Sequence, residues 1–270
     1  MTRFRQVFGD GKPVIGMVHL GALPGTPLHD AKAGLEGLVA AARADLAALQ
    51  KAGFDAVMFG NENDRPYEFD VDRASTATMA FVIGRLREEI TVPFGVNVLW
   101  DPMSTVALAA ATGAAFVREI FTGTYASDMG PWTPDAGQAM RYRDRLGARD
   151  VAMLFNVSAE FADSLDRRPL ADRARSAVFS SIPDAVLVSG QITGEAARME
   201  DLEAVKAALP HTPVLANTGV KHGTVADVLS VADGCVVGSA LKRDGDTWKP
   251  VDPDRAADFM ARARAARGGQ

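Results

Sequence analysis

Eight short apolar runs alternate with longer stretches in helical pattern, and this alternation restricts the fold more than any other feature. The runs lie at residues 14–19, 56–59, 94–99, 116–120, 151–155, 185–189, 214–216 and 235–237. They begin about 32 residues apart on average, roughly the length that one strand, one helix and two loops need. The runs are almost continuously apolar, as in parallel strands covered by helices on both faces. We therefore predict a single (β/α)8 barrel domain over residues 1–270. The alternative, an open doubly wound sheet, more often has about five to seven strands.

Composition and charge exclude several classes of protein. The chain has 29 Lys and Arg against 34 Asp and Glu, a net charge of −5, so it lacks the basic surface of a nucleic-acid partner. One cysteine excludes an internal disulfide and a Cys-based zinc site. Neither a signal peptide nor an apolar run long enough to cross a bilayer is recognisable, so we expect a cytoplasmic protein without integral membrane association. A homo-oligomer is compatible with such a barrel, although no apolar helix face in the sequence argues for one.

Small residues follow the last two apolar runs, where barrels often bind phosphate. Gly219 and Val220 follow the seventh run, and Gly238 and Ser239 follow the eighth. Glycines let a backbone approach an anion closely, and free N–H groups at a helix start suit negative charge. We predict phosphate contacts from these four residues and from Gly190, with added charge from Lys242. The alternative is that the glycines only make tight turns.

Ionisable and amide side chains gather where barrel enzymes place their chemistry, at the carboxyl ends of the strands. The catalytic candidates are His19, Glu62, Asn97 and Glu119. A carboxylate and an imidazole across a barrel mouth suit general acid/base catalysis. Asn97 interrupts an apolar run, and a buried amide needs partners. Alternatively, His19 bridges the loop that follows it, and Glu62 is a solvated charge paired with Arg65.

Further polar residues at the strand ends are candidates for substrate binding: Asn61, Asp101, Arg118, Asp128, Asn156, Ser189, Gln191 and Asn217. Because Arg118 and Glu119 are adjacent on a strand, we expect only one of them to point into the barrel. A divalent cation held by Glu62, Asp101 or Glu119 is compatible with these oxygen ligands, although no spacing demands it. No cofactor is otherwise indicated.

Two remaining features carry less chemistry. The segment 121–132 is a long loop rich in Gly, Pro and aromatic residues, which suits a lid, a partner-binding segment or a structural cover. Cys235 opens the last apolar run in apolar company, so we expect a small core residue.

Several long motifs resemble those of the BtpA/SgcQ family. They lie at residues 13–25, 95–99, 122–130, 188–194 and 237–253, and so extend over nearly the whole chain. That family is similar to phosphate-binding TIM barrels. Its cyanobacterial members are associated with photosystem I accumulation, and others accompany sugar-utilisation genes. The resemblance implies either an enzyme of phosphorylated sugars or nucleosides, or an assembly factor.

The chain differs from the family pattern in three places, as a divergent member would. The family tends to carry Glu-Asn-(Phe/Tyr)-Gly-Asp where this chain has residues 60–64, and an Asn in place of Glu119. It also tends to carry Asp-Val-His-(Val/Lys)-Lys-His where this chain has Asn-Val-Ser-Ala-Glu-Phe at 156–161. If the missing His and Lys residues are catalytic in relatives, this protein has a different chemistry or none.

Two classes of function follow. The first is a lyase, isomerase or hydrolase that acts by general acid/base catalysis on a small phosphorylated sugar- or nucleoside-like metabolite. A Schiff-base mechanism is disfavoured, since no lysine ends a mid-barrel strand. The second is a non-catalytic assembly, stability or ligand-binding factor of the photosystem I biogenesis type.

Overall fold

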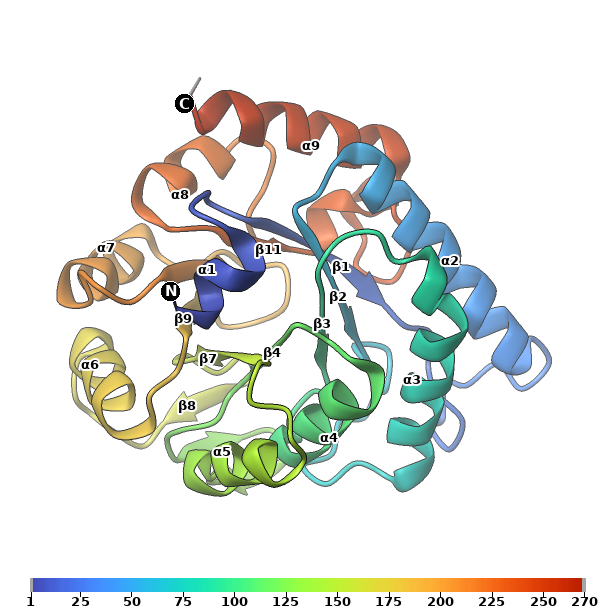
Figure 1. Cartoon of the computed structure of the whole chain (residues 1–270), viewed down its shortest axis with the longest axis horizontal. Coiled ribbons are helices and arrows are strands. Elements are labelled where there is room, and N and C mark those ends of the chain that lie inside the picture. The colour runs from blue at the N-terminus through green and yellow to red at the C-terminus, as the bar shows by residue number, and fades with distance from the viewer. Residues whose placement is uncertain (1, 269–270) are drawn as a thin grey trace.

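The computed structural model describes residues 2–268 and contains a closed barrel of parallel strands surrounded by helices (Figure 1). The strands follow one another around the barrel in chain order, and the last pairs with the first, with Ile15 opposite Val236. The eight apolar runs are therefore confirmed as the eight barrel strands. They are β1 (Val14–His19), β2 (Ala56–Gly60), β3 (Phe94–Asn97), β4 (Phe116–Glu119), β7 (Ala152–Asn156), β9 (Ala185–Ser189), β10 (Val214–Asn217) and β11 (Cys235–Val237).

The outer helices begin and end at residues that the sequence marks. Gly53 ends α2 in a left-handed conformation with φ of 83°. Asp252 caps α9 by accepting hydrogen bonds from the N–H groups of Asp254 and Arg255, and Pro253 occupies the first helical position. The helices are α2 (Gly34–Ala52), α3 (Arg73–Leu86), α4 (Pro102–Thr112), α5 (Ala136–Arg145), α6 (Leu170–Ser181), α7 (Met199–Ala208), α8 (Val225–Val231) and α9 (Pro253–Ala266). Three short 3-10 turns occur at Arg87–Glu89, Ser239–Leu241 and Arg243–Gly245.

Besides a small apolar cluster around Trp100 and Trp132, the apolar core has two layers. The larger one lies between the strands and the outer helices and includes Cys235, which is fully buried as expected. The second fills the interior of the barrel toward its amino end, where α1 (Arg3–Phe8) packs across the opening (Figure 1). Phe8 of α1 lies 5.1 Å from Phe116 between ring centroids. The amino end is therefore filled with side chains, which leaves the carboxyl end for a site.

A small antiparallel sheet lies outside the barrel and was not predicted. It consists of β5 (Tyr125–Ser127), β6 (Gly130–Trp132) and β8 (Ala162–Ser164), in the order β6-β5-β8. The segment expected as an irregular loop after the fourth strand is thus mostly a hairpin, with the segment after β7 paired to it. Trp132 of this sheet packs on Trp100, with ring centroids 5.0 Å apart.

Across residues 2–268, the structure contains no helix with the length and apolar character that a membrane crossing requires.

Candidate active site

Two adjoining hollows open at the carboxyl ends of the barrel strands. The first, which we call the glycine hollow, encloses about 410 Å³ including its part open to solvent. Its lining includes His19, Glu62, Asn217, Thr218, Gly219, Gly238 and Ser239. The second, the aromatic hollow, encloses about 380 Å³ by the same measure and includes Tyr67, Trp100, Phe161, Asn97, Glu119 and Asn156. Leu99, Arg118, Glu160 and Thr193 line both hollows, so the two form one continuous mouth.

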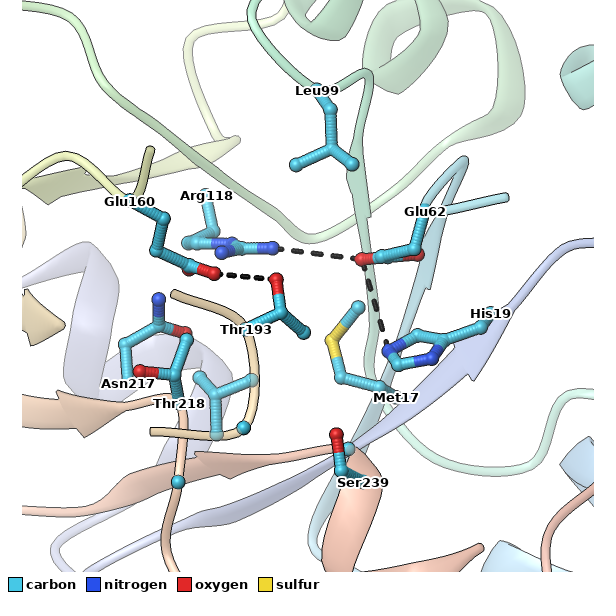
Figure 2. A pocket seen from close by; sticks show the side chains of 14 residues that line it. Met17, His19, Glu62, Leu99, Arg118, Glu160, Thr193, Asn217, Thr218 and Ser239 are labelled. Atoms are coloured by element: carbon cyan, nitrogen blue, oxygen red, sulfur yellow. Dashed lines mark hydrogen bonds and ion pairs between the residues drawn. The ribbon is translucent and has the colours of Figure 1, made fainter. Parts of the chain in front are cut away.

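Glu62 lines one side of the glycine hollow, between His19 and Arg118 (Figure 2). Its Oε1 is 3.8 Å from His19 Nε2 and 3.8 Å from Arg118 Nη2. Its Oε2 is buried and has no hydrogen-bond partner among the described residues. Gly60 leaves room for the Glu62 carboxyl group, because a Cβ at residue 60 would lie 2.5 Å from Glu62 Oε1. Glu62 is therefore held inside the site instead of pairing with Arg65, whose guanidinium stacks on Trp248.

Arg118 continues a polar chain into the aromatic hollow. Its Nη2 donates to Asn97 Oδ1 at 2.7 Å, and Asn97 Nδ2 donates to Glu119 Oε2. Glu119 also accepts from the backbone N–H groups of Ile120 at 2.7 Å and Trp100 at 3.2 Å. The expectation that only one of Arg118 and Glu119 points into the barrel is therefore wrong. Glu119 is the last residue of β4, and its carboxyl group turns back over the strand end to meet Asn97.

Burial changes the protonation of these groups. Burial raises the pKa of Glu62 from 4.5 to about 7, although Arg118 opposes the change. Burial likewise raises the pKa of Glu119 to about 7 against the hydrogen bond from Ile120. The pKa of His19 lies well below its ordinary value because of burial and the nearby Lys242 charge. At neutral pH the imidazole is thus neutral, and the raised pKa values of both carboxyl groups suit proton exchange near neutral pH.

Of the predicted phosphate residues, Gly219, Gly238 and Ser239 line one end of the glycine hollow, whereas Gly190 and Val220 do not. Two of the glycines are needed for close packing of the backbone. Gly219, with φ of 61°, lies under the loop 190–198: a Cβ there would be 2.1 Å from Ala196 N. Gly190 has the same role, since its Cβ would lie 2.3 Å from Glu195 O. Gly238 and Ser239 line the hollow, whereas Val220 is buried outside the lining.

Lys242 does not add charge to this end of the hollow, contrary to expectation. Its Nζ donates to Asp45 Oδ2 of α2 at 2.6 Å, and the side chain is 1% exposed. The backbone N–H of Val251 also donates to Asp45, at 2.8 Å. Lys242 therefore ties the segment after β11 to the helix layer, and its charge reaches His19 and Glu62 only at a distance.

Five of the predicted substrate-binding residues lie outside both linings: Asn61, Asp101, Asp128, Gln191 and Ser189. Asp101 caps α4 by accepting from Ser104 N at 2.8 Å, and Asn61 accepts from Leu99 N at 2.8 Å. Asp128 and Gln191 are exposed. The roles of Asp101 and Asn61 visible here are structural.

The remaining predicted residues form a second polar network. Ser189 Oγ accepts from Asn156 Nδ2 and from Asn217 Nδ2, each at 2.7 Å. These contacts fix both amides where they line the mouth, Asn156 in the aromatic hollow and Asn217 in the glycine hollow. Ser189 thus positions Asn156 and Asn217 and does not itself line the mouth.

Sequence reasoning missed Glu160, Thr193 and the aromatic walls. Thr193 Oγ1 donates to Glu160 Oε2 at 2.6 Å across the mouth (Figure 2). Burial raises the pKa of Glu160 as well. Glu160 lies four residues beyond the end of β7, in the segment 156–161 that differs from the family pattern. That difference was the available signal, but it was interpreted as a loss of ionisable groups and not as a gain of one.

Glu62, Asp101 and Glu119, the candidate cation ligands, do not form a metal-binding group in the described part of the chain. Within residues 2–268, no three His, Cys, Asp or Glu side chains approach closely enough to hold an ion together. Glu62 and Glu119 lie on either side of Arg118 and Asn97, and Asp101 caps a helix.

Comparisons with known proteins match nearly the whole chain to one family. The model of the BtpA family matches residues 10–265. The sgc region protein SgcQ of Escherichia coli K12 is 46% identical, over 99% of this chain and 100% of that protein. The photosystem I biogenesis protein BtpA of Synechocystis sp. is 32% identical, over 94% and 89% respectively.

Among solved structures, N-(5'-phosphoribosyl)anthranilate isomerase from Pyrococcus furiosus aligns with a TM-score of 0.56 at 16% identity. The alignment covers 94% of this chain and 99% of that one. A structure described as native KDPGal aligns with the same TM-score at 17% identity, over 94% and 93%. At such identities these likenesses show the barrel fold alone.

Proposed function

Since this chain belongs to the BtpA family, we propose that it is an enzyme acting by general acid/base catalysis on a small phosphorylated sugar- or nucleoside-like metabolite. The reaction is of the lyase, isomerase or hydrolase type. One observation carries the proposal: Glu62 is buried, its Oε2 has no hydrogen-bond partner among the described residues, and its carboxyl group borders a hollow. Leaving a buried carboxyl oxygen unpaired costs free energy, so a ligand that pairs with it accounts for its place.

Glu62 is the proton donor and acceptor in this proposal. A carboxyl group with a pKa of about 7 both gives and takes a proton near neutral pH. His19 is neutral beside it and offers a hydrogen bond without competing for charge. Arg118 stabilises the ionised form of Glu62 and any negative charge that develops on the substrate.

Asn97 and Glu119 position the other side of the reacting centre. Glu119 already accepts three N–H hydrogen bonds from the protein, so its oxygens are less free to meet a substrate than Oε2 of Glu62. By accepting from Asn97 Nδ2, it fixes the amide so that Oδ1 faces Arg118. Glu119 therefore orients Asn97 and Arg118 in this proposal and is not the first proton donor.

The phosphate lies at the glycine end of the first hollow. Gly194, Gly219, Gly238 and Ser239 come together there, and small residues permit close approach of backbone N–H groups to an anion. Arg118 supplies a cationic side chain to the lining of this hollow, whereas Lys242 lies outside it and is paired with Asp45. The proposal includes the cytoplasmic location expected from the sequence and leaves room for a homo-oligomer.

A second candidate is a non-catalytic binding or assembly factor. Two observations favour it: the segment 156–161 contains no His or Lys, and one relative is a photosystem I biogenesis protein. Against it stand the raised pKa values of Glu62 and Glu119 at the mouth, since perturbed carboxyl groups in a cleft are typical of catalytic sites.

Ligand stabilisation and turnover separate the two candidates. The melting temperature is measured with inorganic phosphate, ribose 5-phosphate and other sugar and nucleoside phosphates at millimolar concentration, and conversion is followed by NMR. We expect a rise with phosphate compounds and conversion of at least one. Absence of any rise would contradict the phosphate site.

Glu62→Gln should then lower turnover about 100-fold or more while the rise in melting temperature persists. Glu88→Gln, an exposed carboxyl before β3 and away from the mouth, serves as the matched control and should leave turnover unchanged. Binding without turnover of any compound would favour the non-catalytic factor.

A further inference from the structure

The aromatic hollow lies directly beside the proposed phosphate end but has a different chemistry. Resting on the proposed function, we propose that the substrate is a phosphorylated nucleoside whose planar nitrogenous base occupies this hollow, while its phosphate occupies the glycine hollow. The four residues shared by both hollows place the sugar between them, beside Arg118 and Glu160.

Flat apolar walls favour a planar ring. Tyr67 and Phe161 form one aromatic pair, with centroids 6.0 Å apart, and Trp100 contributes a third ring to the lining. Trp100 is 3% exposed and packs edge-on against Trp132. Aromatic rings that are fixed before binding lose little freedom when a base stacks on them, and every base offers a flat face for stacking.

The backbone is strained at these walls. Trp100 has φ of 67° and Phe161 has φ of 52°, in the left-handed region that bulky residues rarely adopt. Trp100 N–H is held by Glu119 at 3.2 Å, and Phe161 N–H by the carbonyl of Gln191 at 2.8 Å. Thr218, in the glycine hollow, has φ of 65°. Strain of this kind persists where a site requires a particular geometry, and here it places side chains around both hollows.

Two carboxyl groups, Glu119 and Glu160, offer acceptors in the aromatic hollow, beside the donors of Arg118 and Thr193. Glu160 Oε2 accepts from Thr193, Glu119 accepts backbone N–H groups, and Asn156 presents an amide. Carboxylate acceptors pair with the N–H groups at the edge of a nitrogenous base. A second sugar also stacks on aromatic rings, but its many hydroxyl groups would meet Leu99 and Ile120, whose side chains offer no hydrogen bond.

The test compares ligands that differ only in the base. Dissociation constants are measured by tryptophan fluorescence and calorimetry for ribose 5-phosphate and for AMP, GMP, CMP and UMP. We expect at least one nucleotide to bind about tenfold or more tightly than ribose 5-phosphate, as one stacked base provides. Binding of all four nucleotides within threefold of ribose 5-phosphate would overturn the inference and leave the proposed function standing. No binding of any of the five compounds would overturn both.

A pair of variants locates the effect. Phe161→Leu keeps an apolar side chain but removes the ring, so it should abolish the nucleotide advantage and leave the affinity for ribose 5-phosphate unchanged. Phe179→Leu changes a phenylalanine that is 89% exposed on α6 and should change neither affinity. An unchanged nucleotide advantage in Phe161→Leu, or an equal loss for both ligands, would contradict placement of the base in the aromatic hollow.

Discussion

Replacing Glu62 with glutamine should make the protein more stable at alkaline pH, by an amount that its buried carboxyl group sets. The pKa of Glu62 rises from 4.5 to about 7 on folding because burial disfavours the charge. Between these values the folded state holds more protons than the unfolded state, so the free energy of unfolding falls as pH rises. At 1.36 kcal/mol per pH unit, the loss across the interval is about 3 kcal/mol.

Glutamine has no charge to bury, so Glu62→Gln escapes this loss. We expect the two proteins to have similar stability near pH 4.5, and the variant to be more stable by about 3 kcal/mol at pH 8. The gain should be present in full above pH 7 and vanish as pH falls toward 4.5.

Urea unfolding followed by circular dichroism at half-unit steps from pH 5 to pH 8 measures this difference. Glu88→Gln, with its exposed carboxyl, is the control and should follow the wild type throughout. A stability difference that stays constant from pH 5 to pH 8 would show that burial does not hold Glu62 protonated. Its role as proton donor at neutral pH would fail with it.

Three further predictions concern the frame around the site. Lys242→Met leaves Asp45 buried without its ion pair, so it should lower the free energy of unfolding in urea by about 3 kcal/mol. A decrease below about 1 kcal/mol would show that the pair does not stabilise the fold. Gly219→Ala should lower the free energy of unfolding by more than about 1 kcal/mol and speed tryptic cleavage in the loop 190–198, because the new Cβ would lie 2.1 Å from a backbone nitrogen. Gly223→Ala is the control, since open space surrounds it, and it should change neither quantity. Equal cleavage rates in the two variants would refute the contact. Cys235, whose pKa is raised to about 12 by burial, should react with a thiol reagent only after unfolding, so rapid labelling of the native protein would contradict its position.

The barrel was predictable because one property, continuous apolarity along each strand, identifies all eight of its strands in the sequence. Strands buried on both faces must be apolar along their whole length, so runs such as 185–189 stand out without knowledge of their partners. The caps at Gly53 and Asp252 are equally local, since each needs only its own backbone neighbours. The small sheet was missed because its strands have three residues each, and one contains Gly130 and Pro131.

The site was predictable only in outline. That Glu62 and Asn97 follow or end strands is visible in the sequence, but which neighbour each meets depends on how the chain closes. The expectation that Arg118 and Glu119 face opposite ways assumed a strand that continues, whereas β4 ends at Glu119. Lys242 was expected at the anion because of its sequence position, but Asp45 lies 197 residues away and only the fold brings it near. The aromatic walls come from three separate segments and carry no common motif.

The packing of α1 across the amino end has a kinetic consequence. Phe4, Phe8 and the interior cluster fill the barrel below the site, so a compound bound at the mouth cannot leave through the base. For an enzyme built this way, entry and exit share one opening. Product must leave through the opening that substrate enters, so accumulated product competes with substrate for the same site. Product should therefore inhibit competitively, raising the apparent KM and leaving the maximal rate unchanged.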